Sequence, residues 1–419
     1  MKKFGIYFLY LSIILEPVMG VKLSPIPGLS IKNTAFYILI LALIAGNASS
    51  GRPILAWSKL NIPIIIYLVY IVLSMVMTSN FGGIPGYYLG AEIIYIKMTI
   101  ESYMIFFVGY NLFHNKKDLL DVIGSQLVML FVLNMITILS TYGLISIERI
   151  IVEKGGRTTG AFGEQNQYAA YVVLFIPYAI MAAMMSKNMM KKAFYAVVVI
   201  TALFTVLLTG SRGGMLAIIL GVCSLVTLQA RKVTPAIVGR LLAVSVLFAL
   251  FSTVVFLVLP EESQLGIIDN VVGRAEDQSL DDYSSGRMDF WPLLLGMFME
   301  SPLWGTGWHT VNQLTGYNSH NDFLLVLTEG GMIGFILFCL IFKLFVSGAK
   351  RARPLWSENR WIYNTFIAGI YSILLAMFFV NLYLPYLFVF LYAGLVLKLA
   401  TLEIRDYVRA QRLDAAGVG

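Results

Sequence analysis

The chain has 419 residues, of which 58% are hydrophobic and 13% are charged, and its formal net charge is +7. A soluble protein carries about 25% charged residues, so this composition excludes a soluble enzyme and predicts a polytopic membrane protein. The positive charge does not indicate nucleic-acid binding, because the basic residues border apolar stretches as they do in cytoplasmic loops. The two cysteines lie inside apolar runs and the three histidines lie far apart, so we expect no disulfide framework and no metal site.

Apolar residues are grouped in stretches long enough to cross a membrane, which takes about 20 residues. By this criterion the sequence predicts twelve spans, at residues 4–21, 31–47, 61–78, 92–113, 119–145, 166–185, 193–210, 213–229, 236–259, 322–347, 361–380 and 383–402. They predict an all-α helical bundle that forms a single integral membrane domain over residues 1–419. We expect the first span to be retained, because it contains Glu16-Pro17 and lacks a small-x-small cleavage site.

Lysine and arginine are concentrated on one predicted side of the membrane. With the N-terminus in the cytoplasm, 21 of the 30 basic residues fall on the inner side, eight on the outer side and one, Lys97, within a span. Positive residues are enriched in cytoplasmic loops, so we expect both termini to be cytoplasmic. The largest outer segment is then the loop 260–321, and helical spacing between Ser285 and Trp308 predicts a short interfacial helix within it.

The large outer loop ends in a polar run that enters an apolar helix. His320 lies at this junction, where water meets lipid, and imidazole can gain or lose a proton near neutral pH. The position suits a residue that moves a proton in catalysis. The alternative interpretation is a helix N-cap formed by Ser319 or Asn321, with Asp322 favourable near the helix N-terminus. The sequence leaves both interpretations open, and they are compatible.

Three arginines lie in small-residue turns on the predicted outer side. Arg212 lies in the run 209–214, between two spans and directly before a helix. An arginine at a helix N-terminus can bind an anion, although a snorkelling arginine in a tight turn is the alternative. Arg157 and Arg287 lie in similar Gly-rich or Ser-rich turns, where a solvated side chain is the ordinary interpretation. Together the three suit a di-anion such as a lipid-linked pyrophosphate, because guanidinium pairs with phosphate oxygens bidentately.

The predicted fourth span contains three charged residues, Glu92, Lys97 and Glu101. Lys97 and Glu101 are four residues apart and therefore share one helical face, so they can form a buried ion pair. Charges within membranes are costly and often functional. We favour a structural role for this pair, and the sequence gives Glu92 no assigned role.

Several short polar motifs follow one another in order: Arg157-x-x-Gly160-x-Phe162-Gly163-x-x-Asn166, Thr209-x-Ser211-Arg212-Gly213, Gly286-Arg287-x-x-x-Trp291, Ser301-Pro302-x-x-Gly305-x-Gly307, and His320-Asn321-x-x-Leu324 with Glu329-x-Gly331-x-x-Gly334. In this order they resemble the bacterial O-antigen ligase and polysaccharide polymerase superfamily. The resemblance runs from about residue 157 to residue 334. The predicted spans with one large outer loop extend it over nearly the whole chain, but the motifs do not separate the members of the superfamily.

The resemblance implies an inverting glycosyltransferase of the bacterial inner membrane with a periplasmic active site. Its donor would be a glycan on undecaprenyl pyrophosphate, its acceptor would be a sugar hydroxyl on a glycan or on lipid A–core, and no metal or other cofactor would be needed. His320 would accept the acceptor proton, and Arg287 would stabilise charge on the pyrophosphate. Substrate binding would be shared by further residues: Arg212, Arg157, Ser211, Asn166, Trp291, Asn321, Asp322 and Glu329.

Three activities stay open at this point. We favour a polymerase that joins lipid-linked repeat units, because residues 319–324 and the glycine-rich run after them resemble exopolysaccharide polymerases; a chain-length regulator would then be a partner. A ligase that moves the glycan to lipid A–core uses the same donor chemistry. A flippase is a different class, but the sequence shows no internal repeat, and its polar groups gather at one face. In a test of the arginines, we expect Lys32→Ala to be a neutral control.

Overall fold

The structure is a computed structural model, and it describes residues 2–19, 30–153, 156–230, 287–353 and 359–415, together with five single residues between 239 and 264. Within these residues the elements are helices, and the only extended pairing is one isolated antiparallel bridge between Val152 and Thr158. The prediction of an all-α polytopic membrane protein is confirmed.

The N-terminal half contains eight described helices. Their bounds are α1 Lys2–Met19, α2 Ile31–Ala48, α3 Asn61–Phe81, α4 Leu89–Asn111, α5 Lys116–Thr141, α6 Gln165–Met185, α7 Met189–Thr209 and α8 Arg212–Gln229. The C-terminal half adds α13 Arg287–Glu300, α14 Thr310–Thr315, α15 Asp322–Ala352, α16 Arg360–Ala376 and α17 Leu384–Ala415.

Nine of the described helices are long and apolar enough to cross a membrane: α2 to α8, α15 and α17. The helices α1 and α16 also form where spans were predicted. Helix α16 has only 17 residues, and the 18 residues of α1 include three charged ones, Lys2, Lys3 and Glu16. The predicted span 236–259 lies outside the described residues. The number twelve therefore stays a prediction.

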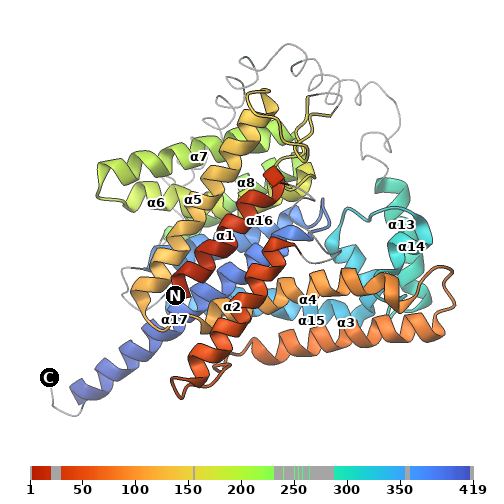
Figure 1. The fold of residues 1–419 in the computed structure, drawn as a ribbon, viewed down its shortest axis with the longest axis horizontal. Coiled ribbons are helices and arrows are strands. Elements are labelled where there is room, and N and C mark those ends of the chain that lie inside the picture. The colour runs from red at the N-terminus through yellow and green to blue at the C-terminus, as the bar shows by residue number, and fades with distance from the viewer. Residues whose placement is uncertain are drawn as a thin grey trace.

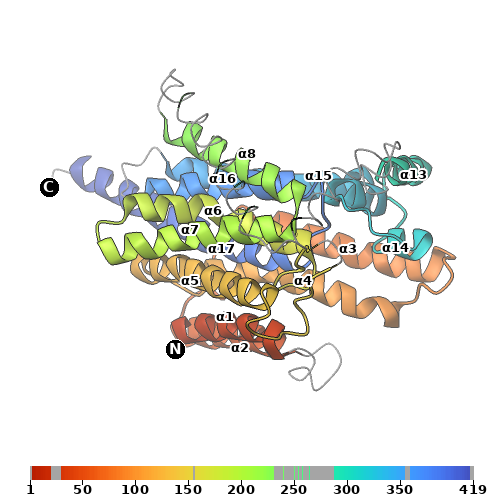
Figure 2. The same cartoon turned by 90° about the horizontal axis from the view of Figure 1, so that it is seen from above.

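The helices pack in stacked layers. Figure 2 shows α1 and α2 on one face and α8 and α16 on the other, with α17 between them. In the apolar 18-residue stretch of α17, 89% of the residues are buried. The backbone of α17 approaches α4 closely: a Cβ on Gly394 would lie only 2.5 Å from the carbonyl oxygen of Phe106. Small residues commonly allow such close helix contacts in membranes, so α17 is the central helix of the bundle.

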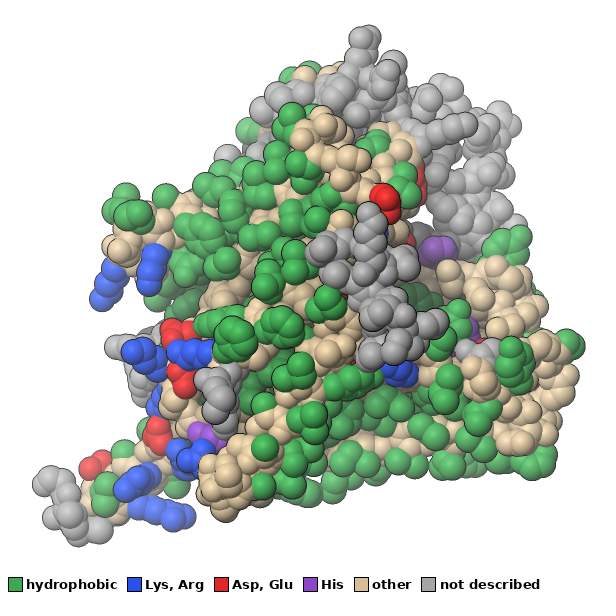
Figure 3. Space-filling model, in the orientation of Figure 1, with side chains coloured by type: hydrophobic (Ala, Val, Ile, Leu, Met, Phe, Trp, Pro, Cys, Tyr) green, Lys and Arg blue, Asp and Glu red, His purple; other side chains and the backbone are tan. Residues whose placement is uncertain are grey.

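The two ends of the bundle differ. The termini lie towards one end, and α13 and α14 lie at the opposite end (Figures 1 and 2). On the face shown in Figure 3, apolar side chains cover the flank, and most lysine and arginine side chains gather towards the C-terminus. This separation agrees with the charge bias in the sequence, while the side of the membrane that each end faces stays a prediction.

The predicted interfacial helix is shorter than expected. Helix α13 ends at Glu300, and a turn separates it from the six-residue helix α14. Gly305 and Gly307 in that turn have φ values of 76° and 111°, which a continuing α-helix cannot contain. The prediction of one helix over 285–308 is therefore wrong beyond Glu300.

Candidate functional site

The turn before α15 holds His320 in an unusual backbone conformation. His320 has a φ of 47°, in the left-handed region that non-glycine residues seldom adopt. Its backbone N–H donates a 2.7 Å hydrogen bond to Oδ1 of Asn381, and the hydroxyl of Ser319 donates to the same oxygen at 3.0 Å. The side chain of His320 is exposed. The backbone of the predicted proton acceptor is therefore fixed from outside its own helix.

Asn321 is the N-cap of α15. Its Oδ1 accepts hydrogen bonds from the backbone N–H groups of Phe323 and Leu324 at 3.0 and 3.1 Å. These bonds satisfy two of the N–H groups that a helix start leaves without intrahelical partners. The capping interpretation is thus confirmed for Asn321, and Ser319 instead bonds to Asn381.

Asp322 fastens α15 to the connection between α16 and α17. Its buried carboxyl group accepts hydrogen bonds from the N–H of Leu382 at 3.0 Å, the hydroxyl of Tyr386 at 2.9 Å and the side-chain amide of Asn381 at 3.3 Å. In the other direction, the N–H of Asp322 donates to the carbonyl of Met377 at 2.8 Å. A residue predicted to bind substrate therefore also closes a structural junction.

Helix α13 lies against the same turn. The indole N–H of Trp291 donates to the carbonyl of Ser319 at 3.3 Å. Arg287 is the first residue of α13, one helical turn before Trp291. The contact places the start of α13 in the neighbourhood of His320.

The second predicted group gathers where α7 ends and α8 begins. The hydroxyl of Ser211 caps α8 by accepting from the N–H of Gly214 at 3.2 Å, and it donates to Oδ1 of Asn166 at 2.9 Å. Nε of Arg157 donates to the carbonyl of Thr209 at 3.0 Å. A cation at a helix C-terminus is favourable, so Arg157 stabilises the end of α7. Arg212 is the exposed first residue of α8.

The connection 377–384 lies between the two groups. On one side Asn381 bonds to the His320 turn. On the other side, Oε1 of Gln167 in α6 accepts from the N–H groups of Tyr383 and Leu384, both at 3.3 Å. A Cβ on Gly213 would lie only 2.6 Å from Cβ of Phe379, so the start of α8 also packs against this connection. The structure thus brings the predicted groups around residues 157–214 and 319–322 to one segment.

A cavity of about 650 Å³ opens beside the connection 377–384. It lies among the starts of α2 and α17, helix α4, the α14 region and the first turns of α15. Among the predicted site residues whose side chains are described, Asp322 and Glu329 line it. The remainder do not line it: His320, Asn321, Arg157, Asn166, Ser211, Arg212 and Trp291.

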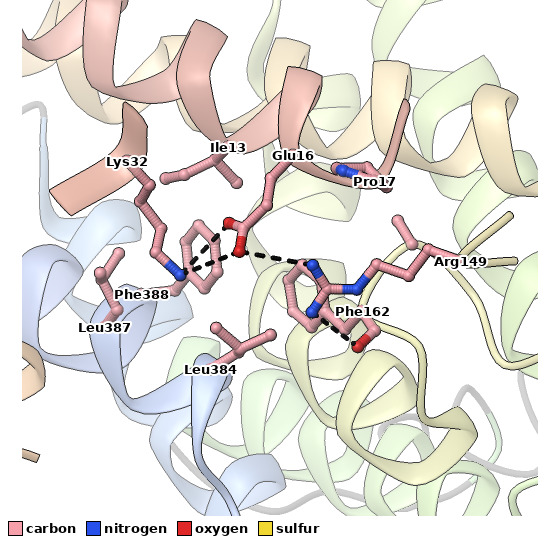
Figure 4. Close-up of a pocket in the computed structure, with 10 residues that line it drawn as sticks. Ile13, Glu16, Pro17, Lys32, Arg149, Phe162, Leu384, Leu387 and Phe388 are labelled. Atoms are coloured by element: carbon pink, nitrogen blue, oxygen red, sulfur yellow. Dashed lines mark hydrogen bonds and ion pairs between the residues drawn. The ribbon is translucent and has the colours of Figure 1, made fainter. Parts of the chain in front are cut away.

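Two cations line one end of the cavity, and both contact Glu16. Lys32 Nζ lies 3.2 Å and Arg149 Nη1 lies 3.3 Å from the carboxylate, and Figure 4 shows both side chains pointing towards it. Apolar side chains, among them Phe162, surround the three. Lys32 is therefore unsuitable as a neutral control. Farther along the cavity, Lys97 pairs with Glu101 at 3.5 Å, as their spacing predicted.

The glycine motifs pack backbone against backbone. Helix α15 is kinked at Gly331, which has φ 58° and ψ −166°. A Cβ there would lie 2.4 Å from the carbonyl oxygen of Leu303, and a Cβ on Gly305 would lie 2.3 Å from that of Glu329. The N–H of Gly307 donates to the same Glu329 carbonyl at 3.0 Å. Because these glycines have no side chain, the backbone of the 301–307 turn can pack directly against the kinked backbone of α15.

His309 lines the cavity and pairs with Glu92, which lies behind it. Nδ1 of His309 lies 2.6 Å from Oε2 of Glu92, and the side-chain amide of Gln313 donates to the other carboxylate oxygen at 3.3 Å. The Glu92 side chain is 0% exposed. The preceding turn is held by Tyr87, whose hydroxyl donates to the carbonyl of Trp308 at 2.5 Å. Burial, and then the charge of Glu92, raises the pKa of Tyr87, so this hydroxyl stays a donor at neutral pH.

A family model described as O-antigen ligase matches residues 197–339. The resemblance to the O-antigen ligase and polysaccharide polymerase superfamily is confirmed. The apolar helices indicate an integral membrane protein, and the family model, which matches about a third of the chain, indicates similarity to membrane glycosyltransferases of the ligase or polymerase type. A search of curated proteins gave no match.

The O-antigen ligase match covers part of the candidate site. It runs from α7 to the first half of α15 and so contains Arg212, Arg287 and His320. It ends before the connection 377–384 and begins after Arg157. The cavity is thus built by helices inside and outside the matched residues.

Sequence reasoning missed the His309–Glu92 pair. The two residues are 217 positions apart, and the sequence placed Glu92 with Lys97 and Glu101 as charges of one span. The three charges do lie on α4. Glu92 pairs with His309, whereas Lys97 and Glu101 pair with each other. No local pattern could have indicated the pair, because the two residues lie in segments that are far apart in the sequence.

Proposed function

We propose that the protein transfers a glycan from undecaprenyl pyrophosphate to a sugar hydroxyl and so joins polysaccharide repeat units on the periplasmic face. The observation that carries this proposal is the cavity of about 650 Å³, lined by ionisable and aromatic side chains within an otherwise apolar bundle. Charged groups inside membrane proteins are costly, and they usually mark a substrate path or a reaction site. A cavity of this size matches the range of small-molecule sites.

The reaction needs little covalent chemistry from the protein. The acceptor oxygen forms a bond to the anomeric carbon while the bond from that carbon to the phosphate oxygen breaks. The acceptor proton passes to a base, and undecaprenyl pyrophosphate leaves with the bonding electrons. Since pyrophosphate is already a good leaving group, the enzyme supplies orientation, a base and cationic stabilisation. Attack from the face opposite the leaving group inverts the anomeric configuration.

His320 is the proposed base. Its backbone is held by Asn381, and the cap of α15 is supplied by Asn321 rather than by His320. An exposed imidazole on a fixed turn can reach a hydroxyl of an incoming acceptor while staying close to water. General bases of this kind typically contribute about 100- to 10,000-fold to a rate.

Arginine side chains are proposed to hold the donor pyrophosphate. Arg212 starts α8, where the helix N-terminus adds to its attraction for an anion. Arg287 starts α13, which contacts the His320 turn through Trp291. Arg157 contacts the end of α7 at Thr209, three residues before Arg212. Lys32 and Arg149 add cations within the cavity itself, where apolar side chains offer a path for the lipid tail.

The ligase alternative has a specific observation in its favour, because the matching family model is described as O-antigen ligase. A ligase would use the same donor and the same roles, with lipid A–core as the acceptor. The polymerase proposal rests on the resemblance of residues 319–324. The two differ only in what occupies the acceptor side of the site.

One experiment separates these functions. Purified protein in lipid nanodiscs is mixed with undecaprenyl pyrophosphate that carries one repeat unit of the host polysaccharide, in the presence and absence of lipid A–core and of a chelator. Longer lipid-linked glycans support a polymerase, and glycan on lipid A–core supports a ligase. We expect the chelator to leave either product unchanged. If no product forms and the same protein moves the lipid-linked glycan across vesicles, the protein is a flippase.

A further inference from the structure

His309 and His320 share a backbone feature. In the part of the chain that the structure describes, they are the two non-glycine residues with positive φ, at 60° and 47°. A side chain with a Cβ is disfavoured in this region, so surrounding contacts must hold it there. Next to His309, two hydrogen bonds hold the backbone of Trp308. The Tyr87 hydroxyl donates to the Trp308 carbonyl at 2.5 Å, and the Trp308 N–H donates to the Ser74 hydroxyl oxygen at 3.0 Å.

The ring of His309 is fixed on two sides. Its Nδ1 lies 2.6 Å from Glu92, and its plane stacks on Tyr95 with ring centroids 4.1 Å apart and an angle of 25° between the planes. A carboxylate can only accept, so the proton of this bond belongs to Nδ1. In the neutral ring, Nε2 then carries a lone pair. No described residue forms a hydrogen bond with Nε2, and His309 lines the cavity.

The surroundings of this ring suit a carbohydrate. Aromatic side chains from Tyr95, Trp308 and Tyr317 line the cavity beside it, together with the amides of Asn312 and Asn318. Aromatic rings cover the apolar faces of sugars, while amides and imidazoles bind their hydroxyls. We propose that this part of the cavity is a glycan-binding subsite, in which Nε2 of His309 accepts a hydrogen bond from a sugar hydroxyl and Glu92 fixes the ring. This inference rests on the proposed function and names the part of the substrate that the cavity recognises.

The subsite is separate from the cationic end of the cavity. Glu92 and Glu101 are nine residues apart on α4, which is about 14 Å along the helix axis. His309 pairs with Glu92. Glu101 instead accepts a hydrogen bond from the hydroxyl of Tyr37, which belongs to α2, the helix that carries Lys32. Lys32 and Arg149 meet at Glu16 (Figure 4). The cations are thus positioned for phosphate, and His309 is positioned for the sugars that extend from it.

Replacement of His309 by asparagine isolates Nε2. Asparagine tolerates positive φ, and its side-chain amide can still donate to Glu92, but it has no atom where Nε2 lies. We expect His309→Asn to raise KM for the lipid-linked glycan roughly 5- to 100-fold, because a hydroxyl loses its acceptor, with kcat changed less than about threefold. The longer His309→Gln, which returns an acceptor oxygen, should recover part of the loss. The matched control is His114→Asn, since His114 follows the opposite end of α4 and bonds to Asn47.

A normal KM in His309→Asn would overturn the proposal, because it would mean that His309 serves only to neutralise Glu92. A fall in kcat with an unchanged KM would also overturn it and would assign His309 to the chemical step. Either outcome in His309→Asn leaves the proposed transferase activity intact. If the wild-type protein forms no product, the transferase activity is refuted, whereas the subsite is not.

A binding measurement decides the subsite without any turnover. Tryptophan fluorescence of the nanodisc protein is followed during titration with undecaprenyl pyrophosphate, with and without its repeat unit. The wild type should bind the glycosylated lipid more tightly than the bare lipid, and His309→Asn should lose that difference while it binds the bare lipid equally well. Equal glycan-dependent gains in the two proteins would refute the subsite.

Discussion

Replacing Asp322 by alanine tests how the predicted site is held together. Asp322 is 3% exposed, and its carboxyl group accepts three hydrogen bonds from the segment 381–386. Alanine leaves the buried N–H of Leu382 and the hydroxyl of the half-buried Tyr386 without this acceptor. Asn381 is affected less, because its amide also donates to the hydroxyl of Ser319 at 2.7 Å.

The size of the effect follows from these two donors. An orphaned buried donor costs about 1–3 kcal/mol, so Asp322→Ala should lower the free energy of unfolding by about 2–6 kcal/mol. Asp322→Asn keeps one oxygen for Leu382, and the hydroxyl of Tyr386 can rotate to accept, so the cost should be about 1–2 kcal/mol. Tyr386→Phe removes one donor and leaves two, and it should cost about 1 kcal/mol.

Activity should fall with stability, because the connection 377–384 also holds the His320 turn through Asn381. A displacement of about 1 Å commonly costs on the order of 100-fold in rate. The assay is thermal unfolding in detergent, with the transferase reaction measured on the same samples. The control is Asp414→Ala, on the exposed end of α17. If Asp322→Ala melts with the wild type and the control, the proposed junction does not stabilise the fold.

Three further predictions address the motif residues. His320→Ala should lower kcat about 100- to 10,000-fold while donor binding persists; full activity would remove it as the base. Arg212→Ala should lower donor use about 100- to 1,000-fold, whereas the exposed Arg409→Ala on α17 should not, and equal losses in the two would show that Arg212 has no special role. Gly331→Ala should destabilise the fold by at least about 2 kcal/mol, because the φ of 58° at Gly331 and its contact with Leu303 exclude a Cβ. The control is Gly296→Ala, where a Cβ meets nothing within 4 Å. It should be neutral or slightly stabilising in a thermal melt.

The positions of the membrane helices could be predicted because hydropathy depends on composition alone. The spans predicted at 31–47 and 213–229 match α2 and α8 to within one residue at each end. The last span was predicted to end at residue 402, but α17 continues to Ala415. Hydropathy marks where a helix leaves the apolar region, while backbone hydrogen bonding continues through charged residues into water.

The cavity could not be predicted, because its polar groups come from distant segments. Lys32 and Arg149 meet at Glu16 from three separate stretches, and motif residues such as Arg157 and Ser211 lie outside the lining. A motif shows which residue types occur together in sequence. It does not show which of them face a cavity, since that depends on how the helices rotate as they pack.

At the start of α15, the two interpretations that the sequence left open are divided between neighbouring residues, and the start of α8 has a similar arrangement. At α15 the cap is Asn321 and the candidate base is His320; at α8 the cap is Ser211 and the candidate anion-binding residue is Arg212. A short polar side chain satisfies the helix N–H groups in each case, so the adjacent residue is not needed for that role. The same arrangement at both sides of the connection 377–384 explains why a capping motif and a functional motif coincide in this sequence.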